Sequence, residues 1–373
     1  MNIGVPKEIK NHEYRVGLTP SCARELIEKG HLVFIETNAG AAIGYLDDQY
    51  KAVGCFIEKS AIDIYSKASL IIKIKEPQPA EFHLLNKNHT IFTYLHLAAD
   101  LNQAQALIKS QAVCIAYETV TDSFGRLPLL APMSAVAGRL SIQIGAHFLQ
   151  KNQGGKGIIL GGIPGTPQGK VLILGGGVVG YHATQMALGL GASIQIIDKN
   201  IERLNELDKI FSGKIQTLFS KKETIEQSLA EADLVIGAAL IPGAEAPHLV
   251  TKKMLSLMQS KSVIVDVAID QGGCFETSRP TTHQDPIYIV DDIIHYCVTN
   301  MPSAAARTAT QALTNATLPF IIELAEKGPE HAMLNNKNLL NGLNIYKGFV
   351  TNSAVANSLN LPFKESLIAI NSF

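Results

Sequence analysis

The chain has 373 residues, of which 46% are hydrophobic and 17% are charged. This length exceeds one ordinary domain of about 100–200 residues, so we expect two domains with separate cores, and the composition excludes a largely disordered protein. Lysine and arginine total 32 against 33 aspartate and glutamate, and this net charge of -1 excludes a broad attraction to nucleic acid or to an anionic membrane.

The cysteines and the apolar segments indicate the compartment. Five cysteines are scattered without a CxxC pair, which argues against a disulfide framework and favours a reducing cytosol. The opening segment, Met1 to Val5, reads as a strand and not as a secretory signal. The sequence has no uninterrupted apolar stretch of about 18 residues that could span a bilayer. We expect a soluble, cytoplasmic protein that binds small molecules, and no metal site is predicted.

The first third of the chain alternates short β-branched runs with helix-like segments. An amphipathic helix is predicted at Pro20–Lys29, and strands are predicted at Leu32–Glu36, Leu70–Ile74, Thr90–Leu95 and Val113–Tyr117. Such alternation is typical of a parallel sheet covered by helices.

The middle of the chain repeats this alternation after a connector. A long helix is predicted at Ala135–Gln150, and the Gly/Pro-rich stretch Lys151–Gly169 reads as a loop. Six strands are then predicted, at Val171–Leu174, Ser193–Ile197, Lys214–Leu218, Asp233–Ala238, Ser262–Val267 and Ile287–Val290. Six is the strand number of a complete dinucleotide-binding fold.

The last part of the chain begins with an Ala/Thr-rich helix at Ala304–Lys327 and ends in a tail too short for a third domain. We expect this part to return to the first domain. The fold class is therefore α/β, with two Rossmann-like, doubly wound parallel-sheet domains. Residues 131–306 form a domain inserted into a discontinuous domain of residues 1–130 and 307–373, with passages near 131–134 and 302–307.

A glycine motif follows the first strand of the inserted domain. Gly175 permits a tight turn, Gly177 lets a pyrophosphate approach the backbone, and Gly180 allows close packing of helix and strand. Asp198 lies 18 residues beyond Gly180, at the end of the next strand. A carboxylate there accepts hydrogen bonds from a ribose diol and repels a 2′-phosphate, so the pattern predicts NAD as the cofactor. The nearby cations Lys199 and Arg203 complicate this preference for NAD over NADP.

Later strand ends are candidates for the same cofactor by their position. Ligands of open α/β sheets bind beyond the carboxyl ends of the strands. The segments at those ends are Ala239-Leu240, Ala268-Ile269-Asp270 and Asn300-Met301.

Four side chains could act on a small amino or keto acid. Arg15 could pair with a carboxylate, or could form a surface salt bridge. Lys75 follows a strand and could project over the edge of the sheet, whereas Lys73 has the same chemistry one residue pair deeper. His96 could transfer a proton at neutral pH, although a histidine in an apolar stretch is more often structural. Asp270 ends an apolar run and could steady an ammonium group, or could simply cap a loop.

Several segments, in order and with their spacing, resemble bacterial alanine dehydrogenases, and the resemblance runs nearly end to end. These segments are Gly4-Val5-Pro6-Lys7-Glu8, Glu13-Tyr14-Arg15-Val16, Lys75-Glu76-Pro77, Tyr94-Leu95-His96-Leu97, Tyr117-Glu118-Thr119, Pro132-Met133-Ser134, Gly175–Gly180, Val267–Asp270, Asn300-Met301-Pro302, Tyr346-Lys347-Gly348 and Val355-Ala356.

The resemblance implies NAD-dependent deamination of L-alanine to pyruvate and ammonium by a homohexamer. It implies that Arg15 and Lys75 bind the substrate, that Met133 borders it, and that His96 and Asp270 are the catalytic pair. It also implies NAD contacts at Ser134, Val178, Val179, Asp198, Arg203, Ser220, Ala239, Leu240, Val267, Ala268, Ile269, Asp270, Arg279, Val298, Thr299, Asn300 and Met301.

The chain departs from this family's pattern at three positions, Ala135, Ser303 and Ala306, where an acidic residue, Gly and Pro are usual. Two other interpretations stay open. The first is the NAD-binding component of a proton-translocating transhydrogenase, which needs a membrane partner and does not need the set Arg15, Lys75, His96 and Asp270. The second is a non-catalytic NAD-sensing protein with the same fold.

Overall fold

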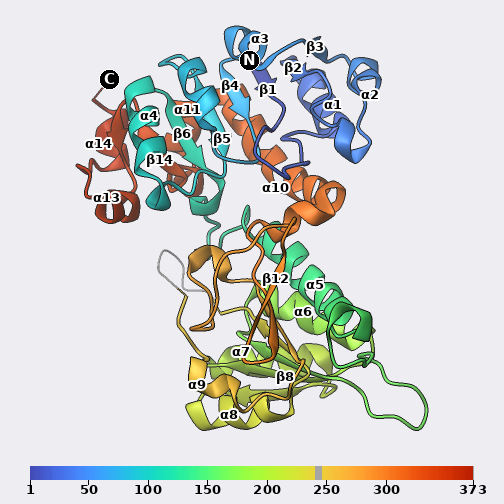
Figure 1. The fold of residues 1–373 in the computed structure, drawn as a ribbon. Coiled ribbons are helices and arrows are strands. Elements are labelled where there is room, and N and C mark those ends of the chain that lie inside the picture. The colour runs from blue at the N-terminus through green and yellow to red at the C-terminus, as the bar shows by residue number, and fades with distance from the viewer. Residues whose placement is uncertain (240–245, 373) are drawn as a thin grey trace. The chain divides into compact units, whose positions relative to one another are not determined.

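A computed structural model describes residues 1–239 and 246–372 of the chain. The chain folds into two compact units, residues 1–133 with 306–373, and residues 134–305 (Figure 1). Both are α/β units with mostly parallel sheets, as predicted from the alternation of strands and helices. Among the residues described, no helix has the length and apolar character needed to cross a membrane.

The first unit is built on an eight-stranded sheet of order β15-β14-β6-β5-β4-β1-β2-β3. Its strands are β1 Asn2–Val5, β2 Leu32–Glu36, β3 Phe56–Glu58, β4 Leu70–Ile72, β5 Thr90–Thr93, β6 Val113–Ala116, β14 Leu343–Tyr346 and β15 Phe349–Val350. Its helices are α1 Pro20–Glu28, α2 Asp47–Ala52, α3 Ala61–Lys67, α4 Leu101–Ser110, α10 Ala306–Lys327, α11 Pro329–Asn335, α12 Lys337–Leu340, α13 Ser353–Leu359 and α14 Ser366–Ile370.

In sheet order, the neighbouring strands β6, β5, β4, β1, β2 and β3 are parallel. The C-terminal tail adds the last two strands to this sheet. β14 pairs antiparallel with β6, and β15 pairs antiparallel with β14. All residues of β4, β5 and β6 are buried, which is typical of parallel strands covered on both faces. The prediction included no strand for β3, β14 or β15. β3 and β15 are only three and two residues long, too short for a pattern of alternation.

Two predicted strands, β4 and β5, end two residues earlier than expected, and both ends lie beside candidate residues. β4 ends at Ile72 and not at Ile74, because the backbone N–H of Ile74 donates to the Glu8 carboxylate (2.6 Å). β5 ends at Thr93 and not at Leu95, because the N–H of Leu95 donates to the Glu118 carboxylate (3.1 Å). Carboxylates thus replace strand partners at this edge of the sheet.

The second unit is built on a seven-stranded sheet of order β12-β13-β11-β10-β7-β8-β9. Its strands are β7 Lys170–Leu174, β8 Ser193–Asp198, β9 Gln216–Phe219, β10 Leu234–Gly237, β11 Val263–Asp266, β12 Ile287–Val290 and β13 Ile293–Tyr296. Its helices are α6 Val178–Gly189, α7 Ile201–Phe211, α8 Lys222–Glu231 and α9 Lys252–Leu255, together with most of α5 Ala131–Phe148. The stretch 131–134, predicted as a passage between domains, is the first turn of α5.

The prediction of six strands was incomplete here. The predicted last strand, β12, is an antiparallel edge strand, and the sixth parallel strand is β13. Only Asp291 and Asp292 separate the two strands, both with positive φ (50° and 66°). Two such residues are typical of a type I′ hairpin turn, which Asp can form although Asn-Gly is its usual signal. The six parallel strands follow the order 3-2-1-4-5-6 of a dinucleotide fold.

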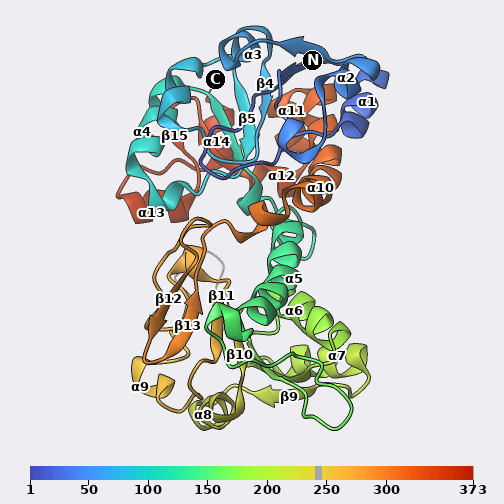
Figure 2. The same cartoon turned by 45° about the vertical axis from the view of Figure 1, so that its right-hand side comes forward.

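The core of the second unit lies on both faces of its sheet. Val171 and Ile173 of β7 pack in one apolar cluster with α5, α6 and α7, and Leu172 and Leu174 pack in another with α8 and α9 (Figure 2). The stretch 151–169 forms the long loop that was predicted as a connector (Figure 1). The helices cover the two faces of the sheet, and loops lie at the carboxyl ends of its strands.

Candidate active-site and cofactor-binding residues

The glycine motif forms the turn between β7 and α6, and each predicted glycine has a different environment. Gly175 has φ +108°, and a Cβ there would lie 2.7 Å from the Ala238 carbonyl oxygen. A Cβ on Gly180 would lie 1.9 Å from the Gly175 carbonyl oxygen. A Cβ on Gly177 would meet no described atom within 4 Å. Gly175 and Gly180 are therefore needed by the fold itself, whereas Gly177 leaves space above the turn.

Gly177 is also the N-cap of the 12-residue helix α6, and no described side chain caps this helix. The N–H groups of its first turn, which includes Val178 and Val179, are therefore available to a phosphate, and the positive end of the helix dipole favours an anion there. The turn thus has the space and the donors that a pyrophosphate requires.

Substitution of the two glycines by alanine is expected to separate fold from cofactor binding. Gly177→Ala should keep the wild-type melting temperature and weaken NADH binding by at least about 10-fold, because the new methyl group occupies the space above the turn. Gly180→Ala should lower the melting temperature, because its methyl group overlaps the Gly175 carbonyl. Thermal unfolding and NADH fluorescence titration measure both effects. Equal NADH affinities of Gly177→Ala and wild type would contradict the assignment.

Asp198 lies beside this turn, at the end of β8. Its Oδ2 atom accepts a hydrogen bond from the Gly176 N–H (2.6 Å), and its Oδ1 atom accepts one from the Asn200 N–H (2.8 Å). Arg203 donates from Nε to the Gly176 carbonyl (2.6 Å), and its Nη1 atom pairs with Glu206 (2.8 Å). The structure therefore brings Asp198 and Arg203 to the glycine turn, and the Arg203 charge is partly compensated by a carboxylate.

Most of the other predicted cofactor residues follow the carboxyl ends of strands in the second unit. Ser220 follows β9, and its N–H donates to the Asp198 carbonyl (2.9 Å). Ala239 follows β10, the segment 267–270 follows β11, and the segment 298–301 follows β13. Leu240 lies outside the described residues. The side chains of Val298 and Met301 are buried in the apolar core, so these two residues could meet a cofactor only through their backbone.

Arg279 and Ser134 have other positions. The Arg279 guanidinium lies over the ring of Tyr288, 4.3 Å from its centroid. Ser134 lies in α5, immediately after the last residue of the first unit.

Asp266, which the sequence analysis placed inside a strand, holds the loop that carries Asp270. Its fully buried carboxylate accepts hydrogen bonds from the N–H of Ala268 (3.1 Å), the N–H of Cys274 (2.8 Å) and the hydroxyl of Ser278 (2.5 Å). Asp270 itself is exposed, in the short 3-10 helix Ile269–Gln271. Asp266 thus braces both ends of this helical turn.

The Asp266 carboxyl is expected to make stability depend on pH. Burial raises its pKa from 3.8 to about 6, against the hydrogen bonds that lower it. The folded state then binds more protons than the unfolded state between these two values, so wild-type stability should fall by about 2 kcal/mol as the pH rises from 4 to 7. Asp266→Asn should lack this slope and should be less stable at pH 4, because its amide cannot accept from both Ala268 and Cys274. Urea unfolding of the wild type and of Asp266→Asn at pH 4 and pH 7 measures the free energy of unfolding. An equal change with pH in the two proteins would refute the role of Asp266.

Arg15 lies in the loop after β1 and is only 2% exposed. Its Nε and Nη2 atoms donate to both carboxylate oxygens of Glu13 (2.7 and 2.6 Å), and its Nη1 atom lies 3.0 Å from Met133 Sδ. One side of the guanidinium is therefore bonded to Glu13, and the Nη1 atom lies beside Met133. The sequence pattern predicts no separate role for Glu13, which is part of the motif Glu13-Tyr14-Arg15-Val16.

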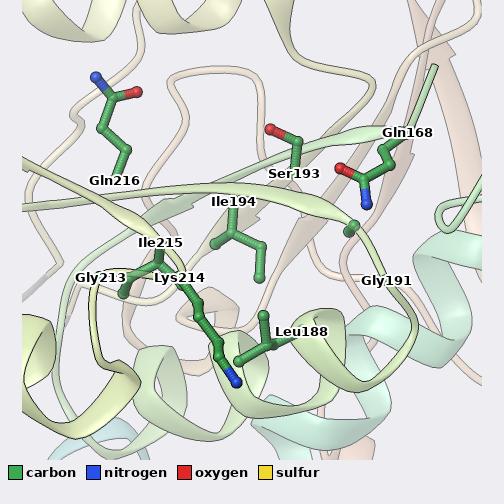
Figure 3. Close-up of a pocket in the computed structure, with 10 residues that line it drawn as sticks. Gln168, Leu188, Gly191, Ser193, Ile194, Gly213, Lys214, Ile215 and Gln216 are labelled. Atoms are coloured by element: carbon green, nitrogen blue, oxygen red, sulfur yellow. The ribbon is translucent and has the colours of Figure 1, made fainter.

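The first unit has a cavity of about 420 Å³ at this loop. Arg15 is among the residues that line it, with Lys7, Glu8, Ile9, Lys10, Asn11, His12, Glu13, Tyr14, Asn38, Ala39 and Ala42. A larger cavity of about 580 Å³ lies in the second unit and is lined by Gln168, Leu188 and Lys214 among others (Figure 3). That cavity lies at the amino ends of β8 and β9, opposite the glycine turn, and contains no predicted site residue.

Lys73 and Lys75 both follow β4 but have different environments. The Lys73 ammonium is fully buried between the carboxylates of Glu8 (3.0 Å) and Glu81 (2.9 Å). Burial alone would lower the pKa of Lys73, but the two carboxylates outweigh it and raise the pKa. Lys75 is 8% exposed, and its charge helps to lower the pKa of the neighbouring Glu76, against the effect of burial. Lys73 thus forms a buried structural ion cluster with Glu8 and Glu81.

His96 is exposed, three residues beyond Thr93, the last residue of β5 that pairs with β6. Its backbone is in the left-handed region (φ 49°, ψ 35°), and its N–H donates to Glu118 Oε1 (2.6 Å). Its ring lies nearly parallel to the ring of Tyr94, with 13° between the planes and 5.8 Å between the centroids. A buried tyrosine thus supports one side of the imidazole. Glu118 is a second residue for which the sequence pattern predicts no separate role.

No group of three or more His, Cys, Asp or Glu side chains within the described ranges could hold a metal ion. The predicted catalytic pair is divided between the units, with His96 in the first and Asp270 in the second.

Comparisons with known proteins give the same result along the whole chain. Residues 4–137 match the family "Alanine dehydrogenase/PNT, N-terminal domain", and residues 141–353 match "Alanine dehydrogenase/PNT, C-terminal domain". A protein of Halomonas elongata named alanine dehydrogenase is 53% identical over 98% of this chain and 99% of its own length. A protein of Staphylococcus aureus named alanine dehydrogenase 2 is 50% identical over 98% of each chain.

Solved structures agree with these matches. A structure entitled L-alanine dehydrogenase has a TM-score of 0.94 and 50% identity, over 96% of this chain and 99% of that one. A transhydrogenase from Sinorhizobium meliloti has a TM-score of 0.79 at 22% identity, over 95% of this chain and 100% of that one, and shows a likeness of fold alone. By the two domain matches and the identity over nearly its full length, the chain belongs to the alanine dehydrogenase/PNT family.

Proposed function

We propose that the protein is an NAD-dependent L-alanine dehydrogenase. It oxidises L-alanine, with water, to pyruvate and ammonium, and it catalyses the reverse reductive amination. The observation that carries this proposal is the 50–53% identity to proteins named alanine dehydrogenase over 98% of the chain. In addition, the chain has the four groups that the chemistry uses, Arg15, Lys75, His96 and Asp270.

The groups around the glycine turn fit NAD. The space above Gly177 and the uncapped start of α6 suit the pyrophosphate, and the Asp198 carboxylate suits an unphosphorylated adenosine ribose. When bound, NAD accepts the hydride from C2 of alanine. The cofactor contacts implied by the family resemblance, from Ser134 to Met301, are part of the proposal. Residues 131–306 are the NAD-binding domain, and residues 1–130 with 307–373 are the substrate domain.

The protein's own groups carry the remaining steps. Arg15 and Lys75 bind the alanine carboxylate, with Met133 beside it, and so orient C2. Alanine reacts as its neutral amine, so loss of the hydride leaves an iminium. His96 takes a proton from a water molecule as it adds to C2 and returns this proton to the nitrogen, which Asp270 stabilises. The C–N bond then breaks as the new hydroxyl group gives up its proton to the departing nitrogen, which leaves as ammonium. The carbonyl of pyruvate forms in that last step.

The proposal also includes the assembly and the compartment. The family resemblance supports a homohexamer, and the scattered, buried cysteines agree with a reducing cytoplasm.

An absorbance assay of NADH oxidation tests the proposed reaction. Pyruvate and ammonium together should be required, glyoxylate and other keto acids should be compared with pyruvate, and NADPH should react poorly. Turnover without ammonium would exclude an amino-acid dehydrogenase. Binding of NADH without turnover would favour an NAD sensor, and hydride exchange between two nicotinamide nucleotides without alanine would favour a transhydrogenase component.

A further inference from the structure

Glu118 stands where the pairing of β5 and β6 stops. The parallel ladder ends with Thr93 opposite Ala116, and beyond it the N–H groups of Leu95 and His96 have no strand to donate to. Glu118 lies two residues past Ala116, in the short 3-10 helix Tyr117–Thr119. Its carboxylate accepts from Leu95 (3.1 Å) and from His96 (2.6 Å), so one side chain replaces the missing ladder.

The remaining backbone groups of this turn are also bonded. The Leu95 carbonyl accepts from the buried Gln103 side chain (3.0 Å), and the His96 carbonyl accepts from the Ala99 N–H (3.2 Å). His96 therefore has a fully bonded backbone in the left-handed region, which a residue with a Cβ rarely adopts without such support. This conformation decides where the Cβ of His96 points, and the Tyr94 ring then supports the imidazole from one side.

We propose that Glu118 is a positioning residue for the catalytic histidine: its carboxylate holds the backbone of His96 in the left-handed conformation that aims the imidazole at the substrate. This inference rests on the proposed function of His96 and extends it. Glu118 touches neither substrate nor cofactor in this assignment and acts through His96 alone. Loss of the carboxylate frees two adjacent N–H groups and lets the turn relax to an ordinary conformation, and a displacement of about 1 Å at a reacting group can cost on the order of 10²-fold in rate.

The test is a double-mutant cycle. Glu118→Ala should lower kcat by about 10–100-fold and leave the Kd of NADH unchanged, and Glu118→Gln, which keeps one acceptor oxygen, should recover most of this loss. In a His96→Ala background, Glu118→Ala should cause no further fall. Asp100→Ala is the matched control, because Asp100 also accepts a backbone N–H, from Gln103 (3.0 Å), but contacts neither the Leu95 nor the His96 N–H. It should change kcat by less than about 3-fold.

Hydrogen exchange supplies a readout that does not depend on activity. The amides of Leu95 and His96 should exchange slowly in the wild type and at least about 10-fold faster in Glu118→Ala, with little change elsewhere in β5 and β6. An equal loss of kcat in both backgrounds, or unchanged exchange at these two amides, would overturn the proposal. If the wild type does not turn over alanine, the proposed function fails, while the exchange result still decides whether Glu118 holds the turn.

Discussion

A His96→Ala variant is expected to lose about 10²–10⁴-fold in kcat, the usual contribution of a group that transfers protons in a transition state. The ring is exposed and lies against the ring of Tyr94, so its removal should leave the fold intact. NADH binding should also stay at the wild-type level, because the glycine turn is in the other unit. Steady-state kinetics, NADH titration and thermal unfolding of the same preparation measure the three quantities.

His89 provides the control for this variant. It is 3% exposed, its Nε2 atom lies 2.8 Å from the Tyr65 carbonyl, and burial lowers its pKa. His89→Ala should therefore lower the melting temperature by more than His96→Ala does, and should leave the kcat of the folded fraction close to wild type. Wild-type turnover by a folded His96→Ala enzyme would remove His96 from the mechanism.

Replacement of the two lysines beyond β4 should have opposite consequences. Lys73→Met leaves Glu8 and Glu81 buried without their cation, and loss of one member of a buried ion cluster costs about 3–5 kcal/mol of unfolding free energy. This loss of unfolding free energy should be smaller at low pH, because burial raises the pKa of Glu8 and a protonated Glu8 needs no cation. Urea unfolding at pH 5 and pH 8 measures both effects.

Lys75→Met should keep most of the unfolding free energy and raise the KM for pyruvate by about 10–100-fold, because a hydrogen bond to a charged group contributes about 1.5–3 kcal/mol. Both variants introduce the same side chain two residues apart, so the pair separates a structural lysine from a substrate-binding one. If Lys75→Met unfolds as readily as Lys73→Met and keeps the KM of the wild type in its folded fraction, Lys75 has only a structural role.

The sequence predicted those parts of the fold that long, regular patterns encode. The glycine turn, Asp198 and the parallel strands of the second unit follow from spacing and apolar runs alone. β13 was missed because the two aspartates of its hairpin turn are not the usual Asn-Gly signal. β14 was missed because its pairing with β6 joins segments more than 200 residues apart, which no local pattern reveals.

The candidate site shows a similar division. The positions of Arg15, Lys75 and His96 near strand ends are enough to propose them as site residues. The position of Lys73 in the sequence does not tell whether its role is structural or functional. That decision depends on Glu8 and Glu81, which come from two other segments of the chain. Glu13 and Glu118 were part of recognised motifs, yet their roles became visible only as distances to Arg15 and His96.

The discontinuous sheet of the first unit has a consequence for synthesis on the ribosome. β6 is complete at residue 116, but its partner β14 begins at residue 343, after the whole of the second unit. The second unit ends at residue 305 and can fold first. The edge of β6 that later pairs with β14 stays bare for the roughly 12–46 s that about 230 further residues need at about 5–20 residues per second. During that interval the bare edge of β6 can pair with another chain, so slower translation between residues 306 and 346 should lower the yield of native protein.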